Sequence, residues 1–185
     1  MKKIFIIPVF AILTLSFLSC EKDQSLDPRP VAINGAYVRL DITKKRLNFD
    51  DLANTSFGGT LTSPGGQVAK YNLYVRRTDG FGSSYGDFKL LKTVTSFPYE
   101  LNITPQDIAT ALSIPLTDIK FADNYRFYGE AFDLSGARSD FYSLSQTIQS
   151  NMAFYKEAFR FRTDVTNNEG MSEAELFVFD NYTPQ

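Results

Sequence analysis

The chain has 185 residues, with 19 lysines and arginines against 21 aspartates and glutamates, so its formal net charge is −2. It contains no histidine, no tryptophan and a single cysteine. This composition excludes histidine-based nucleophilic catalysis, histidine-ligated zinc and an internal disulfide. The slight acidity indicates neither nucleic acid nor anionic lipid as a partner. We expect no cofactor and no metal.

Residues 1–19 have the pattern of an export signal that is removed from the mature protein. A short basic start precedes an apolar run from Ile4 to about Leu15, which is shorter than the roughly 20 residues of a membrane span. Leu18-Ser19-Cys20 resembles a bacterial lipobox, although Phe17 stands where leucine is usual. The resemblance implies lipid attachment at Cys20. The alternatives are ordinary secretion with a stray thiol and a retained membrane helix.

Residues 20–34 are polar and contain prolines, which predicts a flexible tether between the anchor and a folded domain. We expect that domain to cover residues 35–165. Residues 166–185 are expected to form a C-terminal extension with room for one further strand.

Segments with an alternation of apolar and polar residues follow the tether, and this period of two predicts half-buried strands. The clearest places Tyr71, Leu73 and Val75 inward, and another places Tyr125 and Phe127 inward. The predicted strands are Ala36–Ile42, Phe57–Thr62, Val68–Arg77, Phe88–Thr95, Tyr125–Phe132, Ala158–Val165 and Glu173–Asp180. Turn residues between them favour an antiparallel β-sandwich.

One helical insertion interrupts this pattern at about residues 105–119. Thr104 is a capping residue, Pro105 suits the first helical position, and Asp107 completes a capping box. Ile108 and Leu112 then follow at helical spacing.

The stretch from Asp123 to Ser139 resembles the sixth strand and following turn of fibronectin type III and immunoglobulin-like domains. Tyr125, Ala131 and Gly136 hold the places of the corner tyrosine, the strand-end alanine and the turn glycine. The resemblance implies an all-β, immunoglobulin or fibronectin III-like sandwich. In it, the Tyr125 hydroxyl would lock the corner by bonding to nearby backbone.

Three further passages resemble surface lipoproteins of Bacteroidota that accompany glycan-importing outer-membrane complexes. They are Phe57–Leu61, Tyr71–Arg77 and Leu91–Pro98, and the charged start Cys20–Asp23 resembles the signal for the outer face. The resemblance implies the N-terminal module of starch-utilisation-type accessory lipoproteins. It also implies an outer-membrane location that faces the exterior, with an outer-membrane protein as partner.

Candidate binding residues lie on the outward faces of Val68–Arg77 and Tyr125–Phe132, which would be the third and sixth strands of a fibronectin-like sandwich. If these strands are neighbours, Tyr74, Arg76 and Tyr128 share that face, and the glycine-rich loop Gly80–Gly86 adds Phe81 and Tyr85. Tyrosine and arginine dominate binding hot spots, and exposed rings also stack on sugars. Ordinary cross-strand pairing and a plain strand connection are the alternatives.

Three hypotheses follow for function. The leading one is a non-enzymatic accessory lipoprotein that binds a partner in a glycan-uptake assembly. The second is a carbohydrate-binding module that uses exposed tyrosine and phenylalanine rings. The third is a hydrolase that works through two carboxylates, such as Asp50 with Asp51 or Glu130 with Asp133, although no catalytic residue is assigned.

Overall fold

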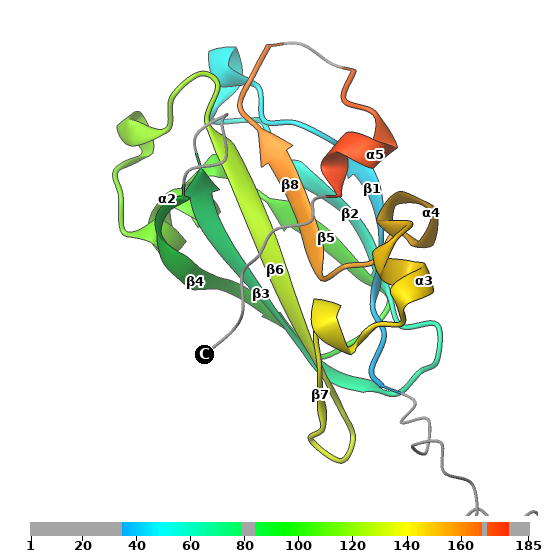
Figure 1. Ribbon diagram of the computed structural model, residues 1–185. Helices are drawn as coiled ribbons and strands as arrows, with labels where there is room; N and C mark the ends of the chain where they lie inside the picture. Colours follow the sequence, from blue (N-terminus) through cyan, green and yellow to red (C-terminus); the bar gives the residue numbers. More distant parts are fainter. Residues whose placement is uncertain (1–34, 79–83, 168–169, 178–185) are drawn as a thin grey trace, which may run out of the picture. The chain divides into compact units, whose positions relative to one another are not determined.

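The computed structural model describes residues 35–78, 84–167 and 170–177, which belong to the second of two compact units, Gly35–Gln185. Their main regular structure is antiparallel β-sheet, and the helices among them are short. Figure 1 shows a three-stranded sheet behind a five-stranded one. The smaller sheet, in the order β1-β2-β5, consists of Arg39–Lys44, Phe57–Thr62 and Tyr99–Ile103. The larger sheet has the order β4-β3-β6-β7, with β8 also paired to β6, and consists of Ser84–Val94, Val68–Thr78, Asn124–Asp133, Arg138–Ser139 and Arg160–Asp164.

The mostly β, antiparallel architecture predicted from the alternating segments is confirmed. Tyr71, Leu73 and Val75 of β3 are buried, as are Tyr125 and Phe127 of β6. The two strands pair in antiparallel register along almost their whole length. Side chains of alternate residues therefore point into the space between the sheets, as the period of two requires.

Aromatic rings join the two sheets at the centre of the core. Phe57 of β2 stacks on Phe127 of β6 and Phe161 of β8, with ring centroids 5.4 and 5.8 Å apart. Phe127 and Phe161 are themselves stacked at 4.9 Å. Each fully buried ring removes a large apolar area from water, so this group contributes several kcal/mol to folding, on the order of 2–3 for each ring.

Two adjacent glycines in β2 allow close approach of the flanking strands. A Cβ atom on Gly58 would collide with the carbonyl oxygen of Leu101, and one on Gly59 would collide with that of Asp41. The pair Gly58-Gly59 is therefore a packing requirement of the smaller sheet, because any side chain would force its strands apart.

The predicted helical insertion is confirmed. Helix α2 (Pro105–Leu112) begins at Thr104, whose side chain accepts a hydrogen bond from the Asp107 amide, while the Asp107 carboxylate accepts one from the Thr104 amide. Buried Ile108 and Ala109 turn the helix towards the core. A short 3₁₀ turn, η3 (Leu116–Asp118), follows it.

The segment between β7 and β8 contains three short helical turns that the alternation did not predict. They are η4 (Phe141–Ser143), α3 (Gln146–Gln149) and α4 (Met152–Tyr155). After them the chain pairs with β1, since the Leu40 amide donates to Lys156 O at 2.8 Å and the Ala158 amide donates to Val38 O at 3.0 Å. This segment therefore joins the two sheets at one edge before it enters β8.

The prediction of a strand at Glu173–Asp180 is wrong for its described part. Residues Glu173–Leu176 form helix α5, which Ser172 and Glu175 open with a reciprocal capping box. Two satisfied amides at the first turn favour the helix over an extended conformation. A second difference concerns β4, which begins at Ser84 and not at Phe88.

Among the described residues, no helix reaches the length and apolarity that a membrane crossing would need.

Candidate functional site

The structure brings three of the predicted site residues together on the outer face of the larger sheet. Tyr74 lies directly opposite Tyr128, and Arg76 lies opposite Arg126, in the β3–β6 register. The rings of Tyr74 and Tyr128 are 6.4 Å apart. The predicted neighbourhood of the third and sixth strands is thus confirmed.

The expectation that Tyr128 is exposed is wrong, because its side chain is only 2% accessible. Its ring lies 5.7 Å from that of Phe88 in β4, and its hydroxyl donates to the Asp140 carboxylate at 3.0 Å. Burial, together with this carboxylate, raises the pKa of Tyr128. The neighbouring strand and the segment after β7 therefore cover a ring that alternation alone places towards solvent.

Tyr74 is half-buried and belongs to the same network. Its hydroxyl donates to Glu130 at 3.0 Å, and Arg138 bridges Glu130 and Asp140 at 3.1 and 3.0 Å. Burial and the Glu130 carboxylate raise the pKa of Tyr74. The network holds the tyrosine in a fixed orientation.

Two residues that were not among the predicted site residues complete this surface. The Arg76 guanidinium lies 4.5 Å from the centroid of the Phe88 ring, and Leu90, 53% exposed, pairs with Tyr74 in the β3–β4 register. We call Tyr74, Arg76, Phe88 and Leu90 the aromatic patch. Phe88 and Leu90 alternate within a predicted strand, so the period-two pattern contained the signal that could have identified them.

The remaining predicted residues divide into two groups. Cys20 and Phe81 lie outside the described residues. Tyr85 belongs to β4, where its backbone pairs with Arg77, so the predicted loop Gly80–Gly86 is wrong for its last three residues. The long β3–β4 pairing extends the hairpin into what the glycines suggested was a connection.

Tyr125 is buried near the start of β6, as predicted, but its hydroxyl has a different partner. It donates to the Asp123 carboxylate at 3.2 Å and not to backbone. The same carboxylate accepts from Arg77 at 2.7 Å and from the Lys120 amide at 2.7 Å. Burial, followed by the Asp123 charge, raises the pKa of Tyr125. The corner is therefore held by a side-chain acceptor.

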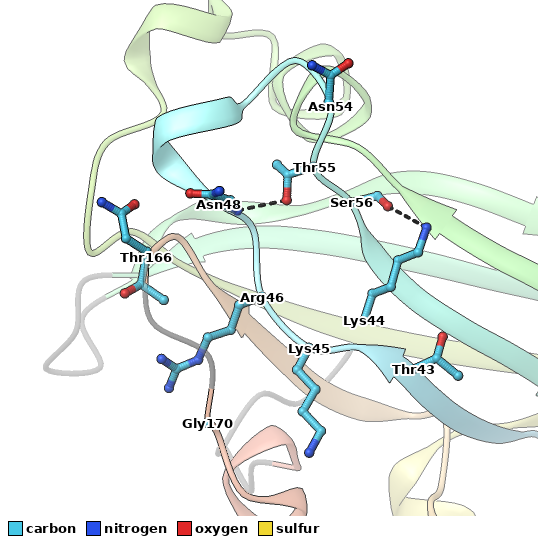
Figure 2. Close-up of a pocket in the computed structure, with 11 residues that line it drawn as sticks. Thr43, Lys44, Lys45, Arg46, Asn48, Asn54, Thr55, Ser56, Thr166 and Gly170 are labelled. Atoms are coloured by element: carbon cyan, nitrogen blue, oxygen red, sulfur yellow. Dashed lines mark hydrogen bonds between the residues drawn. The ribbon is translucent and has the colours of Figure 1, made fainter.

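A second candidate site is a polar cavity of about 600 Å³ at the end of β1, shown in Figure 2. It is lined by Thr43, Lys44, Lys45, Arg46, Asn48, Asn54, Thr55, Ser56, Thr166, Asn167 and Gly170. Buried Leu47 anchors this region, since its amide donates to Asp164 O at 3.0 Å and the Thr166 amide donates to Leu47 O at 2.9 Å. The flanking polar side chains are thereby positioned around the cavity.

Hydrogen bonds fix part of the wall. The backbone amide of Asn48 donates to Thr55 Oγ1 at 2.8 Å, and Lys44 Nζ donates to Ser56 Oγ at 3.0 Å, as the dashed lines in Figure 2 mark. Lys45 Nζ donates to the Met171 carbonyl at 3.3 Å. The connection between β1 and β2 therefore has a defined shape at the cavity.

A neighbouring cavity of about 290 Å³ shares Arg46 and Thr166 with the first one. Its other lining residues include Arg162, Asp164 and Phe121. We call the two cavities together the polar groove. The polar groove was not predicted from the sequence, where the cationic run Lys44-Lys45-Arg46 is the feature that could have indicated it.

Glu157 is a fully buried carboxyl group that lines neither cavity. It accepts hydrogen bonds from the backbone amides of Phe159 at 2.5 Å and Arg160 at 3.2 Å. Burial raises its pKa to about 8, against the lowering effect of these amides and of the Arg160 charge. The group stabilises the backbone turn that precedes β8.

One of the carboxylate pairs considered for hydrolysis, Glu130 with Asp133, is already engaged in hydrogen bonds. Glu130 accepts from Tyr74 and Arg138, while Asp133 accepts from the amides of Ser135 and Ala137 in the turn after β6. Within the described ranges, no group of three or more histidine, cysteine, aspartate or glutamate side chains is placed to hold a metal ion.

Comparison with known proteins adds no assignment to this geometry. No family model, no curated protein and no solved structure matches the chain.

Proposed function

We propose that the chain is a non-enzymatic accessory lipoprotein with an immunoglobulin or fibronectin III-like fold, which binds a partner through the aromatic patch. The order of the strands supports the fold assignment. In immunoglobulin-like domains strands A, B and E share one sheet and strands C, F and G the other. The order β1-β2-β5 corresponds to A-B-E, and β4-β3-β6-β8 corresponds to C′-C-F-G. Buried Tyr125 near the start of β6 fits the place of the corner tyrosine.

The aromatic patch is the observation that carries the proposed function. Aromatic and arginine side chains supply most of the binding free energy in protein interfaces. Here Arg76 lies over Phe88, and Glu130 holds Tyr74, so these side chains lose little conformational entropy on binding. Leu90 adds an exposed apolar contact beside them. The patch therefore presents an ordered, largely apolar surface with a charged rim.

Matched leucine substitutions test this role. We expect Leu90→Asp to abolish capture of an outer-membrane protein from solubilised membranes, since a carboxylate would be buried without a partner in the interface. Leu134→Asp introduces the same charge at a residue that is 83% exposed in the turn after β6, and it should leave capture unchanged. Equal capture by both variants and the wild type would refute the patch as an interface.

Lipid attachment at Cys20 and exposure on the outer membrane are further parts of this proposal. They rest on the lipobox-like sequence, with residues 1–19 as the signal and 20–34 as the tether. Cys20→Ala should move the protein from the membrane fraction to the soluble fraction, because the variant would lack the acyl chains whose buried CH₂ groups hold the protein at the membrane. Unchanged retention in the variant would contradict the anchor.

A carbohydrate-binding module is the second candidate function. An exposed aromatic ring, Phe121, at the edge of the polar groove favours it over further alternatives, because sugar rings stack on such faces. In this version the sugar would bind at the groove, and the aromatic patch would remain available for a protein.

A further inference from the structure

The polar groove concentrates positive charge in a chain whose net charge is negative. Lys44, Lys45 and Arg46 line its larger cavity, and the described residues of that lining include no carboxylate. Arg162 adds a further cation in the smaller cavity, where Asp164 is the one acidic residue among the described lining residues. The groove therefore favours a ligand that carries negative charge.

Neutral polar groups surround these cations. Thr43, Thr55, Ser56 and Thr166 contribute hydroxyl groups, and Asn48, Asn54 and Asn167 contribute side-chain amides. Hydroxyls and amides both donate and accept hydrogen bonds, which suits a ligand that is itself rich in hydroxyl groups. The cavity volumes of about 600 and 290 Å³ fall in the range of small-molecule sites and exceed what a single inorganic ion occupies.

Phe121 supplies an apolar face at the other end of the groove. Its side chain is 55% exposed, and its ring is held edge-on by Phe49 with centroids 6.0 Å apart. Arg46 lines both cavities and so connects the ring to the cationic part of the groove. Figure 2 shows Arg46 extending on the Thr166 side while Lys44 extends towards Ser56.

We propose that this groove is a binding site for an acidic saccharide, with an anionic substituent beside Arg46, which lines both cavities, and one sugar ring stacked on Phe121. Uronic acid carboxylates and sulfate esters provide the same chemistry for the cations. The proposal rests on the second candidate function, carbohydrate binding, and not on the accessory role, and the site shares no residue with the aromatic patch.

Calorimetric titration of the full chain in detergent tests the proposal with three sugars of equal length. Trigalacturonate and a sulfated galactose trisaccharide carry the anionic groups, and maltotriose is neutral. We expect at least one anionic trisaccharide to bind at least tenfold more tightly than maltotriose, and its affinity to fall as salt concentration rises. The sugar that binds identifies carboxylate or sulfate ester as the recognised group.

Matched substitutions locate the site. Arg46→Gln should weaken binding of the preferred sugar about tenfold, because a charge-assisted hydrogen bond is lost, whereas Lys89→Gln on β4 should not change it. Phe121→Ala should weaken binding about fivefold or more. Phe154→Ala is its control, because Phe154 is a ring of 71% exposure that packs edge-on against Tyr155 and does not line the groove.

Several outcomes would overturn the proposal. These are equal affinity for maltotriose and the anionic sugars, binding of inorganic sulfate without any saccharide binding, and unchanged affinity in both Arg46→Gln and Phe121→Ala. If one variant fails to fold, the other variant and the salt dependence decide the question. Leu90→Asp should bind the sugar normally, which separates failure at this site from failure of the aromatic patch.

Discussion

The aromatic patch and the polar groove both place an arginine near a phenylalanine ring, yet the two regions differ in what surrounds these groups. In the patch, Arg76 lies over Phe88, and the adjacent Tyr128 is buried against the same ring. In the groove, Arg46 and Phe121 line a cavity. The same residue types therefore form a closed, ordered surface in the patch and border a cavity in the groove.

The position of each region in the sheets explains this difference. Neighbouring strands place opposite side chains about 5 Å apart, so an outward residue in the middle of a sheet always finds partners. Tyr74, for example, has Tyr128 on one side and Leu90 on the other. The groove forms where β1 and β8 end and the chain turns away, and polar side chains there border a cavity. A cavity bordered by polar side chains is thus more readily built at strand ends.

The largest expected effect is a loss of stability as pH rises, caused by the buried carboxyl group of Glu157. It limits the pH range in which variants of the aromatic patch and of the polar groove can be compared. Buried Glu157 has a pKa of about 8 in the folded protein against an ordinary value of 4.5. Its stabilising contribution is complete below pH 4.5 and is lost as pH rises to about 8, because the unfolded chain releases the proton first. We expect the free energy of unfolding to fall by roughly 4 kcal/mol between pH 5 and 8.

Glu157→Gln should remove most of this pH dependence. Glutamine is neutral and keeps an oxygen that can accept from the amides of Phe159 and Arg160. Urea unfolding of the wild type and the variant at pH 5 and pH 8 measures the difference. Parallel curves for the two proteins would show that Glu157 ionises normally in the fold.

Truncation of Tyr74 and of the adjacent Tyr128 compares a half-buried residue of the aromatic patch with a buried neighbour of the patch. Tyr128→Ala should lower the free energy of unfolding by about 3 kcal/mol, because it removes a buried ring and leaves Asp140 without its hydroxyl partner. Half-buried Tyr74 should cost about 1 kcal/mol when replaced by alanine. Thermal and urea unfolding measure both values. Equal losses would contradict the difference in burial, and Tyr128 is unsuitable as a probe of binding if the prediction holds.

Tyr125→Phe tests the corner at the start of β6. The variant loses one hydrogen bond to Asp123, which still accepts from Arg77 and from the Lys120 amide. We therefore expect a loss of about 1 kcal/mol in the free energy of unfolding. Urea unfolding measures this value, and a neutral result would mean that the hydroxyl contributes nothing to the corner.

The smallest effect is expected in the groove. Arg46→Gln should change the free energy of unfolding by less than about 1 kcal/mol, because Arg46 is only half-buried and the interactions of partly exposed charges contribute little to stability. Arg160→Gln is the contrasting control, because Arg160 is buried over the rings of Phe141 and Tyr142 at 4.3 and 4.6 Å. It should cost at least about 1 kcal/mol. A large loss in Arg46→Gln would show that the groove is structural as well.

Local patterns in the sequence were enough to identify several elements. The alternation in Val68–Thr78 and Asn124–Asp133 determined both strands and their inward faces, because successive side chains of a strand must point to opposite sides. The capping box at Thr104 determined where α2 begins. In each case the residues that decide the structure are neighbours along the chain.

The alternation was wrong at Glu173–Leu176, where another local signal, the capping box of Ser172 and Glu175, forms a helix. Other elements depended on partners that are distant in the sequence. Alternation could not show that β7 and β8 pair with the same strand, β6, although η4, α3 and α4 separate them along the chain. These features follow from which strands meet, and periodicity does not encode that.

The sequence by itself therefore determined the β-rich fold class, the inward faces of the long strands and the capped helix. Only the tertiary structure decided that Tyr128 is buried and that Lys44–Arg46 face the same groove as Phe121 and Thr166. The physical reason is that the exposure of a side chain depends on what packs over it. For Tyr128 the covering residues Phe88 and Asp140 come from other segments, and for the groove the walls come from β1, β8 and the turn before β6, which the tertiary structure brings together.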